Sequence, residues 1–296
     1  MIAARPSPLQ TWLLAARPKT LPAAVAPVVV GTAVAIAEDG FAPIAAVAAF
    51  AVALLLQVGA NLANDVFDFR RGADTAARLG PVRVTQGGLI PPERVLRATW
   101  LVLGAAALAG LVLVLRGGWP ILLLGLLAIA AAVGYTGGPK PFGYLGLGEV
   151  FVFLFFGAVA VAGTAYVQTL DLTGLAAAAA VPIGCLATAI IVVNNLRDIE
   201  TDRAAGKRTL AVRLGAARTR LEYAGLLAVA YLALPVGWAL GLFSVWWWLP
   251  WLSLPVAIPL ARRLATASGA ALNPLLGATA RLEIVFALLL AGGILL

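Results

Sequence analysis

Two stretches of the sequence place clusters of acidic and amide side chains directly after long apolar runs. The first is NLANDVFDFRRGADT, residues 61–75, and the second is NNLRDIETDRAAGKRTLAVRLG, residues 194–215. Together they hold six of the thirteen acidic residues: Asp65, Asp68, Asp74, Asp198, Glu200 and Asp202. Carboxylates three or four positions apart on a helix repel one another, and the repulsion grows where the dielectric constant is low. We therefore expect a cation to balance them.

The spacing within each stretch predicts a set of oxygen ligands on one helical face. These sets are Asn61, Asp65 and Asp68 in the first stretch, and Asn194, Asp198 and Asp202 in the second. The chain has no histidine, and its single cysteine, Cys185, lies in an apolar run. Oxygen ligands favour Mg²⁺ over zinc or copper, and Mg²⁺ is often held by one or two carboxylates together with phosphate oxygens. The pattern favours a site for Mg²⁺ and a diphosphate, and a helix end balanced by arginines alone is the alternative.

The two stretches also resemble each other. When the sequence is shifted by 130 positions, Asn64 falls on Asn194 and Asp68 falls on Asp198. Each stretch continues into basic residues and an Arg-Leu-Gly triplet. We therefore expect one domain, residues 1–296, with a weak parallel internal repeat that relates residues 61–80 to residues 191–215.

The rest of the chain has the composition of a membrane protein. It is 62% hydrophobic and only 11% charged, with a mean hydropathy of +0.99, whereas about 25% of the residues of a soluble domain are charged. Apolar runs near the roughly 20 residues needed to cross a bilayer recur along it. We expect an all-α polytopic protein with about nine transmembrane helices around a central cavity, at residues 20–37, 42–66, 95–115, 119–136, 147–168, 174–196, 221–241, 243–261 and 273–295.

Basic residues predict the orientation of these segments. They collect before the first segment, as Arg5, Arg17 and Lys19, and in every second connection after it, whereas the opposite connections contain only Arg116. The positive-inside rule then places the N-terminus in the cytoplasm and, with nine spans, the C-terminus outside the cell (inner) membrane. Both polar stretches follow even-numbered segments, so the site should open to the cytoplasm. Because the net charge of +8 lies between apolar runs, it reflects this topology and not a nucleic-acid surface.

The paired aspartate stretches resemble those of the UbiA-type intramembrane prenyltransferases. Three further segments match: ARPKTLPAAVAPVVVGTA (residues 16–33), GPVRVTQGGLI (residues 80–90) and YTGGPKPFGYLGLGE (residues 135–149). The last two are similar to the branch of the family that uses 1,4-dihydroxy-2-naphthoate. The resemblance covers residues 16–215, and the last three spans match in hydropathy alone.

This resemblance implies an enzyme of menaquinone biosynthesis that transfers a polyprenyl group to 1,4-dihydroxy-2-naphthoate. Carbon dioxide and diphosphate are lost, and demethylmenaquinol is formed. It implies Mg²⁺ on four catalytic aspartates, Asp65, Asp68, Asp198 and Asp202. The candidate substrate-binding residues are Asn61, Asn64, Arg83, Gln86, Tyr135, Lys140, Glu149, Asn194, Asn195, Lys207 and Arg208.

The chain departs from the broad family pattern in two places. Asp74 lies six positions after Asp68 where the pattern has four, and Tyr135 and Lys140 are five positions apart where the pattern has three. Two other functions are compatible with the sequence. One is the same chemistry on another acceptor, such as 4-hydroxybenzoate, homogentisate or a tetrapyrrole. The other is a transporter with acidic coupling sites, although such sites are expected near the middle of the membrane and not at helix ends.

Overall fold

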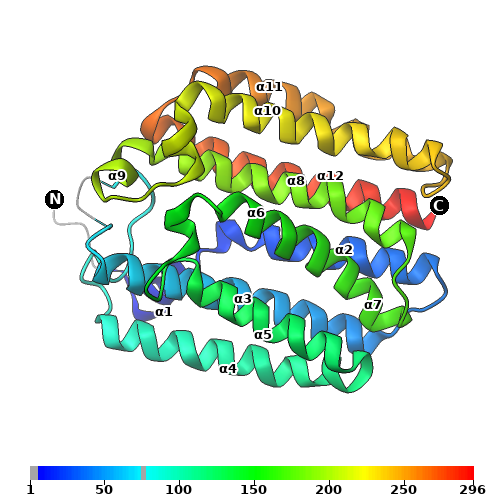
Figure 1. The fold of residues 1–296 in the computed structure, drawn as a ribbon, viewed down its shortest axis with the longest axis horizontal. Helices are drawn as coiled ribbons and strands as arrows, with labels where there is room; N and C mark the ends of the chain where they lie inside the picture. The colour runs from blue at the N-terminus through cyan, green and yellow to red at the C-terminus, as the bar shows by residue number, and fades with distance from the viewer. Residues whose placement is uncertain (1–5, 75–77) are drawn as a thin grey trace.

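The computed structural model describes residues 6–74 and 78–296, and every regular element in these ranges is helical (Figure 1). Arg5 and Thr75 lie outside them. The α-helices are α1 (Pro8–Ala16), α2 (Pro22–Ala37), α3 (Pro43–Arg70), α4 (Pro92–Gly117), α5 (Trp119–Gly134), α6 (Gly148–Val152), α7 (Gly163–Thr169), α8 (Gly174–Arg197), α9 (Ile199–Ala204), α10 (Leu210–Ala239), α11 (Leu254–Thr266) and α12 (Asn273–Leu295). A π-helix, η3 (Phe153–Ala162), joins α6 to α7, and 3₁₀ turns form η1 (Pro18–Thr20), η2 (Phe142–Leu145), η4 (Val245–Ser253) and η5 (Gly269–Leu272).

The helices confirm a multi-pass membrane protein. Six are long and apolar enough to cross a bilayer, and a seventh results if α1 and η1 are counted with α2, from which they are bent by 53°. Each of the nine expected segments overlaps a helix, but two of them fall short of a regular span. Helix α5 has only 16 residues, and η4 is a 3₁₀ helix of 9 residues that leads into the 13-residue helix α11. Nine spans therefore stay a prediction.

Helix α10 starts eleven residues before the expected segment. Thr209 caps it, because its Oγ1 accepts a hydrogen bond from the Val212 backbone N–H at 3.3 Å. The helix then bends at Gly215, whose φ of 77° is a left-handed value that glycine adopts readily. The charged residues after Arg208 are therefore helical, while the membrane-crossing part follows the bend.

Helix α8 forms the centre of the bundle. Of its most apolar stretch of 18 residues, 78% is buried, and α10, α12 and η3 pack around it. A Cβ atom on Gly157 of η3 would lie only 2.7 Å from the Gly184 Cα of α8, so the two backbones meet through glycines. Helix α5 is the opposite case, since none of its residues is buried. The bundle is thus dense around α8 and open toward α5.

Figure 1 shows the two ends of the bundle. Helices α1 and α9 and the C-terminal end of α3 lie at one end, and the C-terminus of α12 lies at the other. Arg116 lies away from the other basic residues, where its Nε and Nη2 donate to the Val167 and Gln168 carbonyls at 2.7 Å each. The fold therefore brings both polar stretches to one end.

Candidate active site

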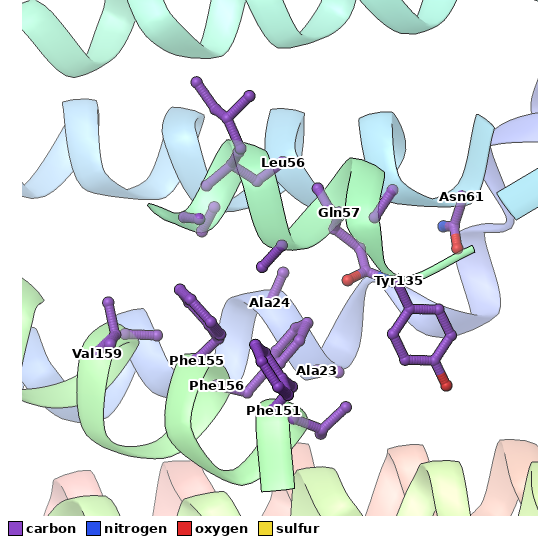
Figure 2. A pocket seen from close by; sticks show the side chains of 18 of the residues that line it. Ala23, Ala24, Leu56, Gln57, Asn61, Tyr135, Phe151, Phe155, Phe156 and Val159 are labelled. Atoms are coloured by element: carbon purple, nitrogen blue, oxygen red, sulfur yellow. The ribbon is translucent and has the colours of Figure 1, made fainter. Parts of the chain in front are cut away.

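A cavity of about 500 Å³ lies inside the bundle. Charged and amide side chains line it near the two polar stretches, and apolar side chains line the remainder. Figure 2 shows Phe151, Phe155 and Phe156 across the cavity from Leu56 and Gln57 of α3. The cavity therefore has a polar region and an apolar region in one continuous space.

Helix α3 contributes a row of polar side chains to this cavity. Gln57, Asn61, Asn64 and Asp68 all line it, at spacings of four, three and four residues that keep them on one helical face. Thr136 holds Asn64, since its hydroxyl donates to Asn64 Oδ1 at 2.9 Å. Asp65 lies off this row and does not line the cavity.

Asp68 is the centre of the polar region. It is 2% exposed, and three segments converge on its carboxylate. The Tyr144 hydroxyl donates to Oδ1 at 2.8 Å, Arg83 Nη2 lies 3.2 Å from Oδ2, and Lys207 Nζ lies 3.1 Å from Oδ1. The first stretch is thus tied to η2, to the connection before α4 and to the connection after α9.

Asp65 has a different set of partners. Its two oxygens accept hydrogen bonds from the backbone N–H groups of Val84, at 3.1 Å, and Thr85, at 3.0 Å. This carboxylate is buried and holds the connection that presents the neighbouring Arg83 to Asp68. In this conformation Asp65 helps to position the Arg83 guanidinium. Its role as a direct metal ligand stays a prediction.

The second stretch does not continue as one helix, so the expectation that its acids share the face of one helix is wrong. Helix α8 ends at Arg197, and Asp198 has φ −99° and ψ 9° before α9 begins. Arg197 binds the Asp198 carboxylate through Nε at 2.8 Å and Nη2 at 2.6 Å. The break nevertheless leaves Asn194, Asp198 and Asp202 lining the cavity.

Lys207 links the two stretches. Its Nζ lies 3.1 Å from Asp68 and 3.9 Å from Asp202. Burial raises the pKa of Asp202 to about 7 against the opposing effect of the Lys207 ammonium, and nearby Asp198 and Asp68 add to the rise. A cation between the stretches is therefore favourable, and an ammonium takes that place here.

The donor chemistry fits Mg²⁺. Asp68, Asp198 and Asp202 supply carboxylate oxygens to one cavity, with Asn64 and Asn194 beside them. Among the described residues no three acids are close enough to enclose an ion by themselves. Phosphate oxygens would have to complete the coordination shell, and Lys207 would have to move aside.

The structure sorts the other predicted residues into two groups. Tyr135 lines the cavity, and so does Asn195, whose Nδ2 donates to the buried Glu149 Oε1 at 2.8 Å. Glu149 lies behind Asn195 and outside the lining. Gln86 is also outside the lining, and Lys140 and Arg208 are exposed, so the structure does not bring these three to the cavity.

The lining residues that the sequence reasoning missed include Arg17, Arg78, Gln57 and Tyr144. Arg17 and Arg78 were counted only as topological charges. Arg78 pairs with Asp74, which also lies 3.3 Å from Arg83, and burial raises the pKa of Asp74. A signal for Gln57 existed, because it is the one polar side chain in an apolar run and lies four residues before Asn61.

Fold and site together define a class: a helical membrane protein whose cavity combines paired aspartate stretches, basic side chains and an apolar interior. The chain belongs to the UbiA prenyltransferase family, whose model matches residues 24–293. It is 45% identical over 284 residues to 1,4-dihydroxy-2-naphthoate octaprenyltransferase of Mycobacterium tuberculosis, with 96% of each chain covered. It is 40% identical over 294 residues to the Escherichia coli protein of that name, with 97% of this chain and 96% of that chain covered.

Solved structures have the same fold. A UbiA homolog from Archaeoglobus fulgidus bound to GPP and Mg²⁺ superposes with a TM-score of 0.65 at 15% identity, covering 95% of this chain and 99% of that chain. The apo structure of a UbiA homolog from Aeropyrum pernix K1 gives a TM-score of 0.68 at 17% identity, with 92% and 96% covered. The chain is therefore an aromatic prenyltransferase by family, with the fold of these homologs.

Proposed function

We propose that this protein transfers a polyprenyl group from its diphosphate to 1,4-dihydroxy-2-naphthoate with loss of carbon dioxide. The observation that carries the proposal is that Asp68, Asp198 and Asp202 line the same cavity as a large set of apolar side chains. The acceptor follows from the relatives of 40–45% identity, which are named for that substrate.

Mg²⁺ is the cofactor of this proposal, in agreement with its presence in the Archaeoglobus homolog. Asp68, Asp198 and Asp202 hold it, and Asn64 and Asn194 complete the set of oxygen donors. When bound, the ion neutralises the negative charge that develops on the leaving diphosphate. Asp65 contributes through the connection that it holds and through Arg83.

Basic side chains bind the diphosphate oxygens. Arg17, Arg78, Arg83 and Lys207 line the same polar region, and they favour the leaving group as its charge grows. With the ion and the diphosphate bound, Lys207 would have to leave the space between Asp68 and Asp202, and its ammonium would then be available to bind phosphate oxygens.

The apolar region holds the prenyl tail and keeps water away from the reacting carbon. The Phe142 and Phe151 rings stack at 3.9 Å between centroids, and Phe155 continues the stack at 6.1 Å from Phe151. Their faces also favour a cation, as aromatic π-systems do. An allylic cation formed here meets the acceptor ring before it meets water.

The bonds balance without a base on the protein. The C–O bond to the diphosphate breaks, and the ring carbon that carries the carboxylate attacks the allylic carbon. The bond from the ring to the carboxylate then breaks, carbon dioxide leaves, and its bonding electrons restore the aromatic ring.

The orientation in the membrane is also part of the proposal. The N-terminus lies in the cytoplasm, the C-terminus lies outside the cell (inner) membrane, and the polar region opens to the cytoplasm. The support is the position of α1 and α9 at one end of the bundle and of the C-terminus at the other. A C-terminal reporter that is active only in the cytoplasm would contradict this topology.

The deciding experiment uses purified protein with a labelled polyprenyl diphosphate, Mg²⁺ and a panel of acceptors. The panel contains 1,4-dihydroxy-2-naphthoate, 4-hydroxybenzoate and homogentisate. We expect a prenylated product and release of carbon dioxide with the naphthoate alone. Turnover of another acceptor in its place would reassign the acceptor, and an absence of transfer with ion-coupled substrate uptake would support a transporter.

A further inference from the structure

Gln57 is a polar side chain within the apolar part of α3, and none of the roles proposed above uses it. It lines the cavity one helical turn before Asn61, on the side away from Asp68. A polar group at such a depth in a membrane helix is costly and is usually functional. Figure 2 shows the carboxamides of Gln57 and Asn61 both projecting from α3 toward the cavity.

Thr20 fixes how the Gln57 carboxamide is turned. The Thr20 hydroxyl donates its only proton to the Arg17 carbonyl at 3.0 Å. Its oxygen can therefore only accept from other groups, and it accepts from Gln57 Nε2 at 3.0 Å and from Asn61 Nδ2 at 2.9 Å. Both amide groups must present their NH₂ side to Thr20, so the orientation follows from the hydrogen-bond network itself.

Two carbonyl oxygens are left over by this arrangement. The second Nδ2 hydrogen of Asn61 is donated to the Ala16 carbonyl at 2.9 Å. Within residues 6–74 and 78–296, no group donates to Gln57 Oε1 or to Asn61 Oδ1. The two residues are one turn apart, about 6 Å of helical rise. That rise is close to the separation of two oxygens in para positions on an aromatic ring.

We propose that Gln57 and Asn61 recognise the para-dihydroxy pattern of the acceptor ring, with Gln57 as the residue that determines specificity. This inference rests on the proposed naphthoate function. Asn61 lies nearer Asp68, so it accepts from the 1-hydroxyl, next to the reacting carbon. Gln57 lies farther from Asp68 and accepts from the 4-hydroxyl.

This placement also favours the reaction. A hydroxyl that donates to a carbonyl oxygen leaves more electron density on its own oxygen, and the ring becomes more nucleophilic at the neighbouring carbon. Because Thr20 holds both carboxamides before the substrate binds, little ordering is needed on binding. Acceptors without a second hydroxyl leave Gln57 Oε1 without a donor in a water-poor site, which costs affinity.

The test compares two acceptors on the full-length enzyme in detergent: 1,4-dihydroxy-2-naphthoate and 1-hydroxy-2-naphthoate, which lacks the 4-hydroxyl. Kinetic constants are measured for the wild type, Gln57→Met and Thr20→Val. We expect Gln57→Met to raise the KM for the dihydroxy acceptor by on the order of tenfold and to leave the KM for prenyl diphosphate unchanged. Its kcat/KM for the monohydroxy acceptor should stay near that of the wild type or rise, because no unpaired carbonyl oxygen then faces this acceptor, so most of the preference between the acceptors is lost. Thr20→Val should lose part of the preference, because Gln57 is then present but less firmly oriented.

Gln168→Met is the matched control. Gln168 is buried in α7 outside the cavity lining, where its Nε2 donates to Thr32 Oγ1 at 3.2 Å. This variant should keep the wild-type preference even if it is less stable. If Gln57→Met keeps the preference, or lowers both kcat/KM values equally, Gln57 has only a structural role and the inference is overturned. A wild type that binds prenyl diphosphate but prenylates neither acceptor would remove the proposed function instead, and the inference with it.

Discussion

The two aspartate stretches are similar in sequence, but the structure uses them differently. In the first, α3 continues without interruption through Asp68 to Arg70, and the cations on Asp68 come from two distant segments, as Arg83 and Lys207. In the second, the helix breaks at Asp198, and the cation comes from the adjacent residue Arg197. The first stretch is therefore completed by distant segments, and the second largely by its own neighbours.

The difference shows where each carboxylate gets its orientation. The Asp68 carboxylate is held by contacts from η2 and from the connections before α4 and after α9. Its position is therefore correct only when the whole polar region is assembled. Asp198 depends on Arg197, which also binds Asn194 Oδ1 at 2.8 Å and Asn273 Oδ1 at 2.9 Å. The second stretch is thus anchored in the dense core around α8, whereas the first is held mainly by connections between helices.

The largest expected effect tests whether the two stretches act as one site at all. We expect removal of divalent metal to abolish prenyl transfer and added Mg²⁺ to restore it, because the oxygen donors come from both stretches. Turnover is measured after treatment with excess EDTA and after Mg²⁺ is added back. Undiminished turnover in EDTA would mean that Lys207 and the arginines suffice.

The next effect tests whether the stretches serve the same chemical step. Asp68→Asn and Asp198→Asn should each lower the rate by roughly 10²-fold or more, since each removes a carboxylate from a metal–diphosphate site. The double variant should be far less impaired than the product of the single effects, because groups that act as a unit are not additive. The measurement is turnover of the three variants, with folding checked by gel filtration. Small effects that multiply would show two independent charged helix ends.

A smaller effect should distinguish Arg83, which binds the aspartate of the first stretch, from Arg197, which binds that of the second. Arg83→Gln should raise the KM for prenyl diphosphate by on the order of tenfold, because Arg83 lines the cavity. Arg197→Gln should mainly lower stability, by about 3–5 kcal/mol, because it leaves the buried Asp198 without its partner. Kinetics and thermal unfolding are measured for both.

Arg203→Gln is the control for this pair, since the Arg203–Glu200 ion pair is exposed and should have little effect. Equal behaviour of Arg83→Gln and Arg197→Gln in both measurements would remove the distinction between the two stretches.

The smallest effect concerns Asp65. Asp65→Asn retains one acceptor oxygen for the backbone amides of Val84 and Thr85. It should therefore weaken the interaction between α3 and the connection before α4 by about 1.5–3 kcal/mol. We expect a smaller loss of turnover than in Asp68→Asn, together with faster proteolysis between α3 and α4. A loss of turnover equal to that of Asp68→Asn, with unchanged proteolysis, would identify Asp65 as a direct metal ligand.

Sequence reasoning located the helices and the charged end of the cavity because both follow from local patterns. Apolar runs predicted segments such as residues 273–295, which coincide with α12. Helical periodicity also placed Asn61 and Asp68 on one face, and both line the cavity.

The remaining features depend on contacts that periodicity does not contain. Asp65 points to a connection whose path is set by tertiary structure, and the break at Asp198 is held by Arg197 and its contact with Asn273 on α12. Lys140 and Arg208 are near the site in sequence, but their side chains extend into solvent. The sequence therefore gives the residue types of the site, and the packing of distant segments decides which of them face the cavity.

Helix α5 has a consequence for the lipid around the protein. Its 16 residues rise about 24 Å, whereas the hydrocarbon core of a bilayer is about 30 Å thick. If α5 crosses the bilayer, the exposed Trp119 at its start and the loop after Gly134 both lie near the headgroups, and the bilayer has to thin locally beside this helix. A membrane-crossing α5 would thus make this wall of the cavity a site of hydrophobic mismatch, and the thickness of the bilayer would then act directly on the protein at this side.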